Sequence, residues 1–168
     1  MLEPFSLAGA KFNEDRTRRY ILWRNWELSF HPPRTVAFIM LNPSIADENK
    51  LDPTVNRCLR FAKRWGYGRM LVGNLYSKVS TDPKGVDFTE AEPTNIDYLR
   101  MISCLSETTV AAWGTNANPK VANETCWSIG RNLHCLGKNK EGSPKHPLYL
   151  RNDARLIPYF ILDKAEKC

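Results

Sequence analysis

The sequence predicts an α/β fold with three layers, α/β/α, in which the middle layer is a four-stranded parallel sheet and a further β element lies on the N-terminal side. Apolar runs of strand length alternate with segments of helical periodicity four times along the chain. Such alternation is typical of a parallel sheet with helices on both faces. The length of 168 residues fits one domain with its own core. We therefore expect a single domain over residues 1–168.

The first half of the chain contains the N-terminal β element, the first core strand and a helix. Residues 1–17 show no regular pattern, whereas 20–26 is rich in β-forming side chains and is expected to be a strand. The run 35–41 is apolar throughout, which is typical of a strand buried on both faces. A helix is expected over 52–66, because aspartate followed by proline is typical of a helix start and glycine of a helix end.

The second half repeats the same alternation. Three further core strands are expected, at 69–75, 108–113 and 133–136. Helices are expected between them, from Pro93 or Thr94 to Leu105 and over 121–130. Residues 137–147 are expected to form a loop, after which the apolar tail residues 156–162 pack back on the core.

Charge and composition limit the classes of partner and cofactor. The chain has 24 Lys and Arg against 18 Asp and Glu, and its net charge of +6 is compatible with a polyanionic partner. There is no apolar run of membrane-span length and no signal-peptide pattern, so we expect a cytoplasmic protein with no membrane partner. The five cysteines have no CxxC spacing, so we expect reduced thiols, no metal and no other cofactor.

Polar segments follow the predicted core strands. They are 42–44 after the first strand, Asn74 at the end of the second, 114–116 after the third, and His146-Pro147 near the end of the pattern. In open parallel sheets, ligands bind at the carboxyl ends of the strands. We therefore expect these segments to meet at one edge of the sheet.

The order of the motifs resembles the family called domain of unknown function 1643, over residues 20–155. The strings that carry the resemblance are LNPS at 41–44, DPT at 52–54, NR at 56–57, WGYG at 65–68, NLY at 74–76, AWG at 112–114 and HPLYL at 146–150. The resemblance names a family without an activity. It also implies, for some relatives, a role in phage defence by removal of bulky modified cytosines.

A more distant resemblance, to the uracil-DNA glycosylase superfamily, implies an activity and a uracil-DNA glycosylase-like fold. Its members have a motif after the first core strand that matches Asn42, and a late His-Pro loop that matches His146. The resemblance implies that Asn42 positions water and that His146 supports the departing base. An amide does not titrate, so Asp47 or Asp52 would supply a carboxylate. Asn42 stands where the fastest uracil enzymes have aspartate, which favours a slow or substrate-selective glycosylase.

The same resemblance implies a pocket for the flipped base. A strand that ends in asparagine recognises the base in these enzymes, and Asn74 matches it. An amide offers both a donor and an acceptor, which suits the edge of a pyrimidine. Pro43 and Ser44 would shape the pocket, and Tyr76 or Trp113 would stack on the extruded ring.

A third group of residues would contact DNA. The resemblance implies that Leu150, or Tyr149, fills the hole that the flipped base leaves in the duplex. Basic side chains beside the His-Pro loop would bind phosphates. They are Lys138, Lys140, Lys145 and Arg151.

Together these features predict a monofunctional DNA glycosylase that leaves an abasic site, because no lysine stands in the matched catalytic motifs. The expected substrate is a flipped, modified pyrimidine, such as glucosylated hydroxymethylcytosine, in duplex or single-stranded DNA, and the expected enzyme is a monomer. Two alternatives stay open. One is a non-catalytic binder of modified or single-stranded DNA on the same fold, and the other is a hydrolase of small nucleosides or nucleotides.

Overall fold

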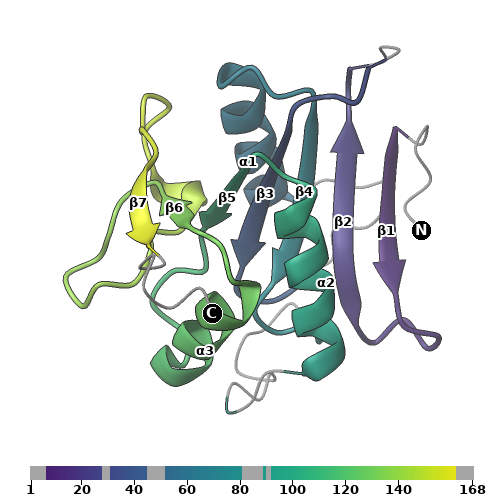
Figure 1. The fold of residues 1–168 in the computed structure, drawn as a ribbon, viewed down its shortest axis with the longest axis vertical. Helices are drawn as coiled ribbons and strands as arrows, with labels where there is room; N and C mark the ends of the chain where they lie inside the picture. The colour runs from purple at the N-terminus through teal and green to yellow at the C-terminus, as the bar shows by residue number, and fades with distance from the viewer. Residues whose placement is uncertain (1–6, 28–30, 45–51, 81–88, 90–91, 162–168) are drawn as a thin grey trace.

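One mixed seven-stranded sheet forms the centre of the molecule (Figure 1). The computed structural model describes residues 7–27, 31–44, 52–80, 89 and 92–161. The strands follow the order β1-β2-β4-β3-β5-β6-β7 across the sheet. Their bounds are β1 Ala8–Phe12, β2 Arg19–Asn25, β3 Thr35–Met40, β4 Arg69–Asn74, β5 Thr108–Ala111, β6 Leu133–Cys135 and β7 Ile157–Phe160.

The inner and outer strands of the sheet differ in direction. The neighbours β4 and β3, β3 and β5, and β5 and β6 pair in parallel. At the two edges, β1 and β2 and then β7 add antiparallel pairs. The predicted mixed α/β class is confirmed, and the sheet is larger than the four strands expected because strands at both edges extend it.

Two of the edge strands have no clear signal in the sequence. β1 lies within 1–17, where no regular structure was predicted, and β7 lies in the segment expected only to pack on the core. The sequence of β1, AGAKF, has low intrinsic strand preference. Its backbone pairs with β2, and Gly9 lies so close to Trp23 that an added Cβ would stand 2.0 Å from the indole ring. Pairing with another strand, β2 for β1 and β6 for β7, gives both segments their strand conformation.

Within the described ranges, three α-helices begin at a proline. α1 spans Pro53–Arg64, α2 spans Pro93–Cys104 and α3 spans Pro119–Ile129. A side chain caps two of them, α1 and α3. The predicted start of α1 is confirmed, because the Asp52 side chain accepts a hydrogen bond of 2.7 Å from the backbone N–H of Val55. α3 begins two residues before the predicted 121, since Asn118 caps its first turn.

The helices cover both faces of the sheet (Figure 1). α1 buries Cys58 and Phe61 against Phe38 on one face. α2 and α3 pack on the other face, where they join a separate core cluster with Ile39. Adjacent residues of β3 thus point to opposite faces, as strand geometry requires. The helices cover the two faces of the sheet, so a ligand site on the sheet would have to lie at the ends of the strands.

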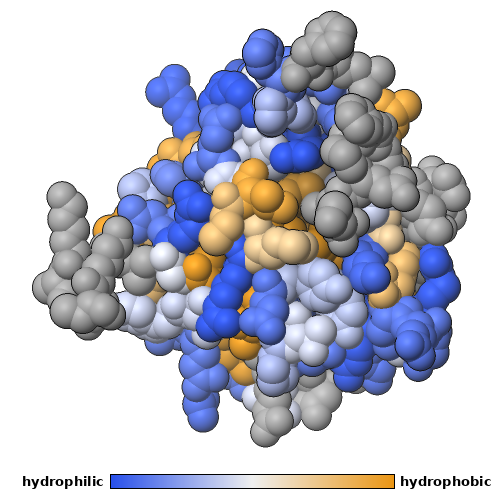
Figure 2. Space-filling view, turned by 45° about the vertical axis from the view of Figure 1, so that its right-hand side comes forward, coloured by the Kyte–Doolittle hydropathy of each residue, from blue (hydrophilic) through white to orange (hydrophobic). Residues whose placement is uncertain are grey.

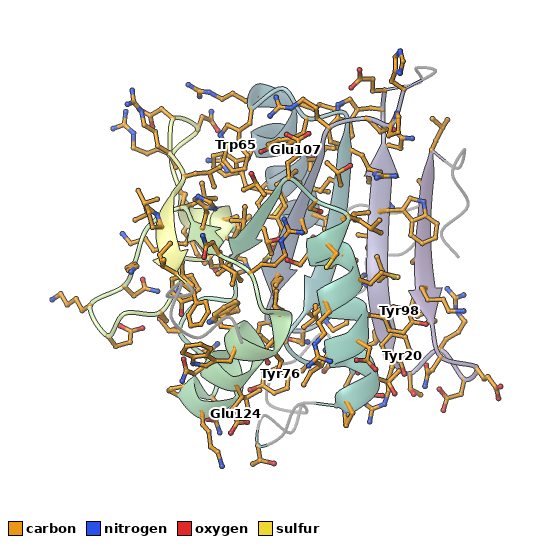
Figure 3. The ribbon with its side chains drawn as sticks, viewed as in Figure 1. Tyr20, Trp65, Tyr76, Tyr98, Glu107 and Glu124 are labelled. Atoms are coloured by element: carbon orange, nitrogen blue, oxygen red, sulfur yellow. The ribbon has the colours of Figure 1, made fainter. Side chains whose placement is uncertain are left out.

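The contact between α2 and the sheet depends on two close approaches. Tyr20 of β2 stacks on Tyr98 of α2 with ring centroids 4.7 Å apart (Figure 3). At Gly73 of β4, an added Cβ would lie 2.5 Å from a methyl of Leu99 and 2.8 Å from one of Ile102. The missing side chain therefore lets α2 lie directly on β4, one residue before Asn74.

The surface is mostly hydrophilic on the face shown in Figure 2, where apolar side chains gather in one patch near the centre. Isolated exposed apolar side chains are normal on soluble domains. Of the helices in the described ranges, none combines the length and the apolar character that a membrane crossing needs.

Candidate functional site

A cavity of about 540 Å³ lies where the parallel strands end. Its walls come from the ends of β3 and β4, the segment after β5, the first turn of α1 and the 3-10 helix η2 (Pro147–Tyr149). Its volume is in the range of pockets that bind small ligands. Among the residues expected from the sequence to act, those that line it are Asn42, Ser44, Asp52, Asn74, Trp113, His146 and Tyr149.

The protein engages the side-chain amide of Asn42 through its nitrogen. Its Nδ2 donates to the backbone oxygens of Pro43 and Ser80, at 3.2 and 3.1 Å. Both partners are acceptors only, so the amide nitrogen must face them, and Oδ1 faces the other way. Because Asn42 lines the cavity, this oxygen is available to accept a hydrogen bond from a ligand or water there.

Asp52 is held by the protein through both carboxylate oxygens. One accepts the backbone N–H of Val55 and caps α1, and the other accepts the hydroxyl of Ser44. The start of α1 thus joins the Asn-Pro-Ser turn after β3. Of the described residues that line the cavity, Asp52 is the only one with a carboxylate. Its engaged geometry suits a structural and electrostatic role.

Asn74 ends β4 with a buried amide that faces the cavity. The residue is 1% exposed, and its Nδ2 has no hydrogen-bond partner among the described residues. Leaving such a donor unpaired costs about 1–3 kcal/mol. The backbone oxygen of Asn74 accepts from the side chain of Asn95 at 2.8 Å, so α2 holds the strand end in place. The sequence did not indicate this role for Asn95.

His146 is a neutral donor at the edge of the cavity. Its Nδ1 accepts the backbone N–H of Leu148 at 3.4 Å, so the neutral ring carries its proton on Nε2. Burial lowers the pKa of His146 below its ordinary value of 6.5, and the negative charge of Asp52 opposes part of that shift. Two residues that the sequence singled out separately are therefore electrostatically coupled.

This coupling predicts how Asp52→Asn changes the titration of His146. The asparagine keeps an oxygen that can cap α1 but removes the charge, so the pKa of His146 should fall further. NMR titration of the imidazole would measure it. Since the folded pKa is below 6.5, the folded state binds fewer protons than the unfolded chain in that window. The contribution of His146 to the free energy of unfolding should therefore be fully present above about pH 6.5 and should be lost as the pH falls through its lowered pKa. An unchanged or raised pKa in Asp52→Asn would contradict the coupling.

Trp113 and Gly114 form the wall after β5. Trp113 is buried and packs edge-on against Tyr159, at a centroid distance of 5.4 Å. Gly114 has a left-handed φ of +77°, and an added Cβ would meet Cβ of His146 at 3.4 Å. A side chain at this position would be strained and would press on His146. The Trp-Gly pair therefore shapes the cavity by packing.

Tyr76 and Leu150 are not at the cavity. Tyr76 is buried in the core beside α3, where its hydroxyl accepts the backbone N–H of Asn118 at 3.3 Å (Figure 3). Leu150 packs against the core cluster that contains α1. The exposed apolar side chains on this loop are Leu148 and Tyr149, and Tyr149 is 85% exposed. If the loop has a wedge, the structure offers these two residues.

The other residues predicted to act do not line the cavity, and one of them lies outside the residues that the structure describes. Lys138 lies over the ring of Tyr159 at 5.5 Å, and Arg151 pairs with Asp153 at 3.2 Å. Pro43 is buried, and its backbone oxygen accepts a hydrogen bond from Nδ2 of Asn42. The described lining of the cavity does not include Lys138, Lys140, Lys145 or Arg151. Asp47 lies outside the described residues.

Arg19 is a cavity residue that the sequence did not single out for this role. It begins β2, is 2% exposed and lines the same cavity as Asn42 and Asn74. Its position in a basic run, KFNEDRTRR, is typical of a solvated surface. Only the pairing of β2 beside β4 brings its positive charge to the strand ends.

The polar side chains of the cavity thus include amides, hydroxyls, an imidazole, a guanidinium and the engaged carboxylate of Asp52. Within the described ranges, no three His, Cys, Asp or Glu side chains come together as metal ligands. The donors of Asn74 and His146 suit a ligand rich in acceptor atoms or one that gains negative charge.

A family model matches most of the chain. The family described as "Protein of unknown function (DUF1643)" matches residues 19–148, which is more than half of the chain. No curated protein and no solved structure matches the chain. The matched region begins at Arg19 and includes Asn42, Asn74 and His146. The chain therefore belongs to the DUF1643 family.

Proposed function

We propose that the protein is a DNA glycosylase that hydrolyses the N-glycosidic bond of a flipped, modified pyrimidine and leaves an abasic site. One observation carries the proposal: Asn42, Asn74 and His146, from three separate parts of the chain, line one cavity at the strand ends. Each presents an atom that one step of the reaction needs. The partner is DNA, and the protein acts on it as a single domain.

Asn42 would place the attacking water. The C1′–N bond breaks through an oxocarbenium-like sugar, as in glycoside hydrolysis. Water then adds its oxygen to C1′, and the proton that it gives up ends on the departing base, directly or through solvent. The Oδ1 of Asn42 can accept a hydrogen bond from that water, because its Nδ2 is committed to Pro43 and Ser80. The contribution is orientation, since an amide does not take the proton.

The departing base leaves with the bonding electrons and needs a donor. His146, neutral and protonated on Nε2, can donate to it. Asn74 supplies a buried Nδ2 for a carbonyl or ring nitrogen of the base. The positive charge of Arg19 in the same cavity favours the anionic leaving group.

The fold supports the same proposal. Parallel pairing of β4, β3, β5 and β6, with helices on both faces, is compatible with a uracil-DNA glycosylase-like core. The motifs at 41–44, 74 and 146–147, which resemble that superfamily, occur at the strand ends or beside them. We infer that the antiparallel edges are additions to that core.

A second candidate is a protein that binds modified or single-stranded DNA without cutting it. The engagement of both oxygens of Asp52 favours this candidate. With Asn42 unable to act as a base, the described part of the cavity has no free carboxylate to accept a proton from water.

The decisive experiment offers the protein a panel of DNAs and measures abasic sites after alkaline cleavage. The panel contains plain, uracil-containing, hydroxymethylated and glucosylated cytosine DNA, each as duplex and as single strand. Strand breaks in one modified DNA only, without an adduct trapped by borohydride, would support a monofunctional glycosylase. Binding with no breaks on any DNA would support the second candidate. Turnover of free nucleosides alone would contradict both.

A further inference from the structure

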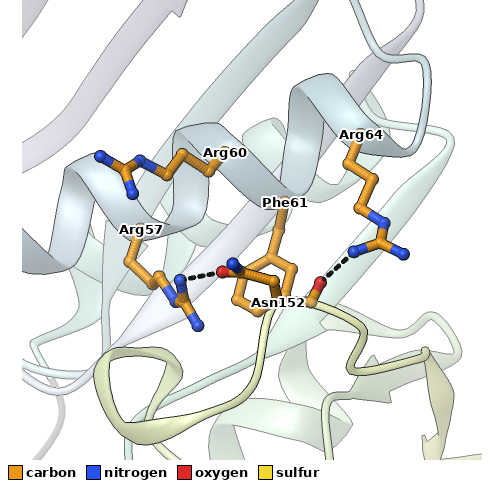
Figure 4. A pocket seen from close by; sticks show the side chains of 5 residues that line it. All are labelled: Arg57, Arg60, Phe61, Arg64 and Asn152. Atoms are coloured by element: carbon orange, nitrogen blue, oxygen red, sulfur yellow. Dashed lines mark hydrogen bonds between the residues drawn. The ribbon is translucent and has the colours of Figure 1, made fainter.

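A second pocket lies on the outer side of α1, and it is dominated by arginine (Figure 4). Its volume is about 240 Å³, and it is lined by Arg57, Arg60, Phe61, Arg64 and Asn152. Figure 4 shows the three arginines leaving one helix, with Asn152 of the facing segment between Arg57 and Arg64. A neighbouring hollow adds Arg151 to the same surface.

In the described part of the chain, few acidic side chains pair with the arginines of this surface. α1, with the sequence PTVNRCLRFAKR, contains no acidic residue. Among the described residues, Arg57, Arg60 and Arg64 form no ion pair, while Arg151 pairs with Asp153. Arg57 donates to Asn152 and to the backbone oxygen of Leu150, and Arg64 donates to the backbone oxygen of Asn152 at 2.7 Å. Those partners are neutral, so they orient the guanidinium groups without cancelling their charge.

The spacing of the arginines suits a row of phosphates. Positions 57, 60 and 64 lie on one face of the helix. At 1.5 Å per residue they span roughly 10 Å, which is about three base-pair rises of one DNA strand. Arginine binds phosphate oxygens with paired donors, and Arg60 is exposed.

Two elements border both the arginine pocket and the strand-end cavity, although the two hollows have no lining residue in common. The first turn of α1 lines the cavity, and the arginines occupy the following turns. The segment 148–152 also borders both, since Leu148 and Tyr149 line the cavity and Asn152 lines the arginine pocket. A strand that lies along α1 would therefore pass beside Tyr149 and enter the cavity.

We propose that the arginine face of α1, formed by Arg57, Arg60 and Arg64, binds the phosphodiester backbone of the DNA strand whose base enters the cavity. This inference rests on the proposed function, because it takes DNA as the substrate. The sequence predicted that lysines beside the His-Pro loop bind the phosphates. The inference assigns the main phosphate contacts to α1 instead. Arg57 and Arg64 also hold 150–152 in place, so Arg60 is the residue whose charge can be changed with least disturbance to the fold.

The test compares Arg60→Glu with Lys120→Glu. Both residues are exposed cations, and Lys120 lies on α3, on the opposite side of the sheet. The two variants make the same change of net charge. Binding of a fluorescein-labelled duplex and of a labelled single strand is measured by anisotropy at increasing NaCl. Arg60→Glu should weaken binding about tenfold and reduce the slope of log K against log salt by about one, whereas Lys120→Glu should change little.

Several results would overturn the inference. They are equal losses in the two variants, unchanged binding in Arg60→Glu, and no binding of either DNA by the wild type. A competition arm with inorganic phosphate distinguishes a free anion from a strand. Displacement of DNA at low phosphate concentration would assign the pocket to a small anion and contradict the backbone contact. Abasic sites are scored on the same wild-type samples. Binding through Arg60 without excision from any DNA of the modified panel would refute the glycosylase and leave the arginine face as a DNA contact.

Discussion

Asn42→Ala is expected to lower the rate of abasic-site formation by about 100-fold or more on whichever modified DNA the wild type cleaves. The estimate is the size of effect seen when one positioning group of an active site is removed. Alanine removes the oxygen that would orient water, as well as the donor to Pro43 and Ser80. Single-turnover rates, measured with protein in excess, would isolate the chemical step from binding.

Asn25→Ala is the matched control for Asn42→Ala. Asn25 is paired with Arg69 at the start of β4, so it lies at the opposite end of the sheet from the cavity. Its substitution should leave the rate of excision within a few fold of the wild type. Both variants should unfold at similar denaturant concentrations. Excision by Asn42→Ala at the wild-type rate, or an equal loss in Asn25→Ala, would remove Asn42 from the proposed mechanism.

Gly73→Val is expected to destabilise the fold by about 1–3 kcal/mol, and by more if α2 cannot move. Valine would place its Cβ 2.5 Å from Leu99 and 2.8 Å from Ile102 in the present packing. Because α2 also carries Asn95, which binds the backbone of Asn74, displacement of the helix should disturb the strand end as well. Urea unfolding would measure the loss of stability.

A double-mutant cycle with Leu99→Ala can show whether the predicted clash is the cause. Leu99 is fully buried, so Leu99→Ala alone should cost about 2–5 kcal/mol. In the Gly73→Val background, the shorter side chain makes room for valine, and the combined cost should be smaller than the sum. If the two losses in free energy of unfolding simply add in the double variant, the valine does not contact Leu99, and the predicted clash with α2 is wrong.

The positions of the local elements were predictable because their signals are local. The apolar run of β3 and the aspartate-proline start of α1 depend on neighbours in the chain, and both were found from sequence. β1 was missed because its five residues gain their hydrogen bonds from β2, and nothing in their own composition indicates it. Local preference is a weak guide where pairing with another strand decides.

The candidate site was predictable in part for the same reason. The strand-end rule placed Asn42, Asn74 and His146 together, and the structure has all three at one cavity. Tyr76 was expected to stack on the extruded base. β4 ends at Asn74, and the ring of Tyr76, two residues later, enters the core. Likewise, the turn of η2 exposes Leu148 and Tyr149 and sends Leu150 inward.

By itself, the sequence determined the α/β class, the core strands and helices, and membership of the DUF1643 family, since each of these is written in runs of neighbouring residues. Only the tertiary structure decided that Arg19 is a buried cavity residue, that Asp52 is engaged through both oxygens, and that the arginines of α1 face the 150–152 segment. Charge and residue type are properties of the sequence. Burial, hydrogen-bond partners and the direction of a side chain depend on segments far away in the chain, and these decide what the same residue can do.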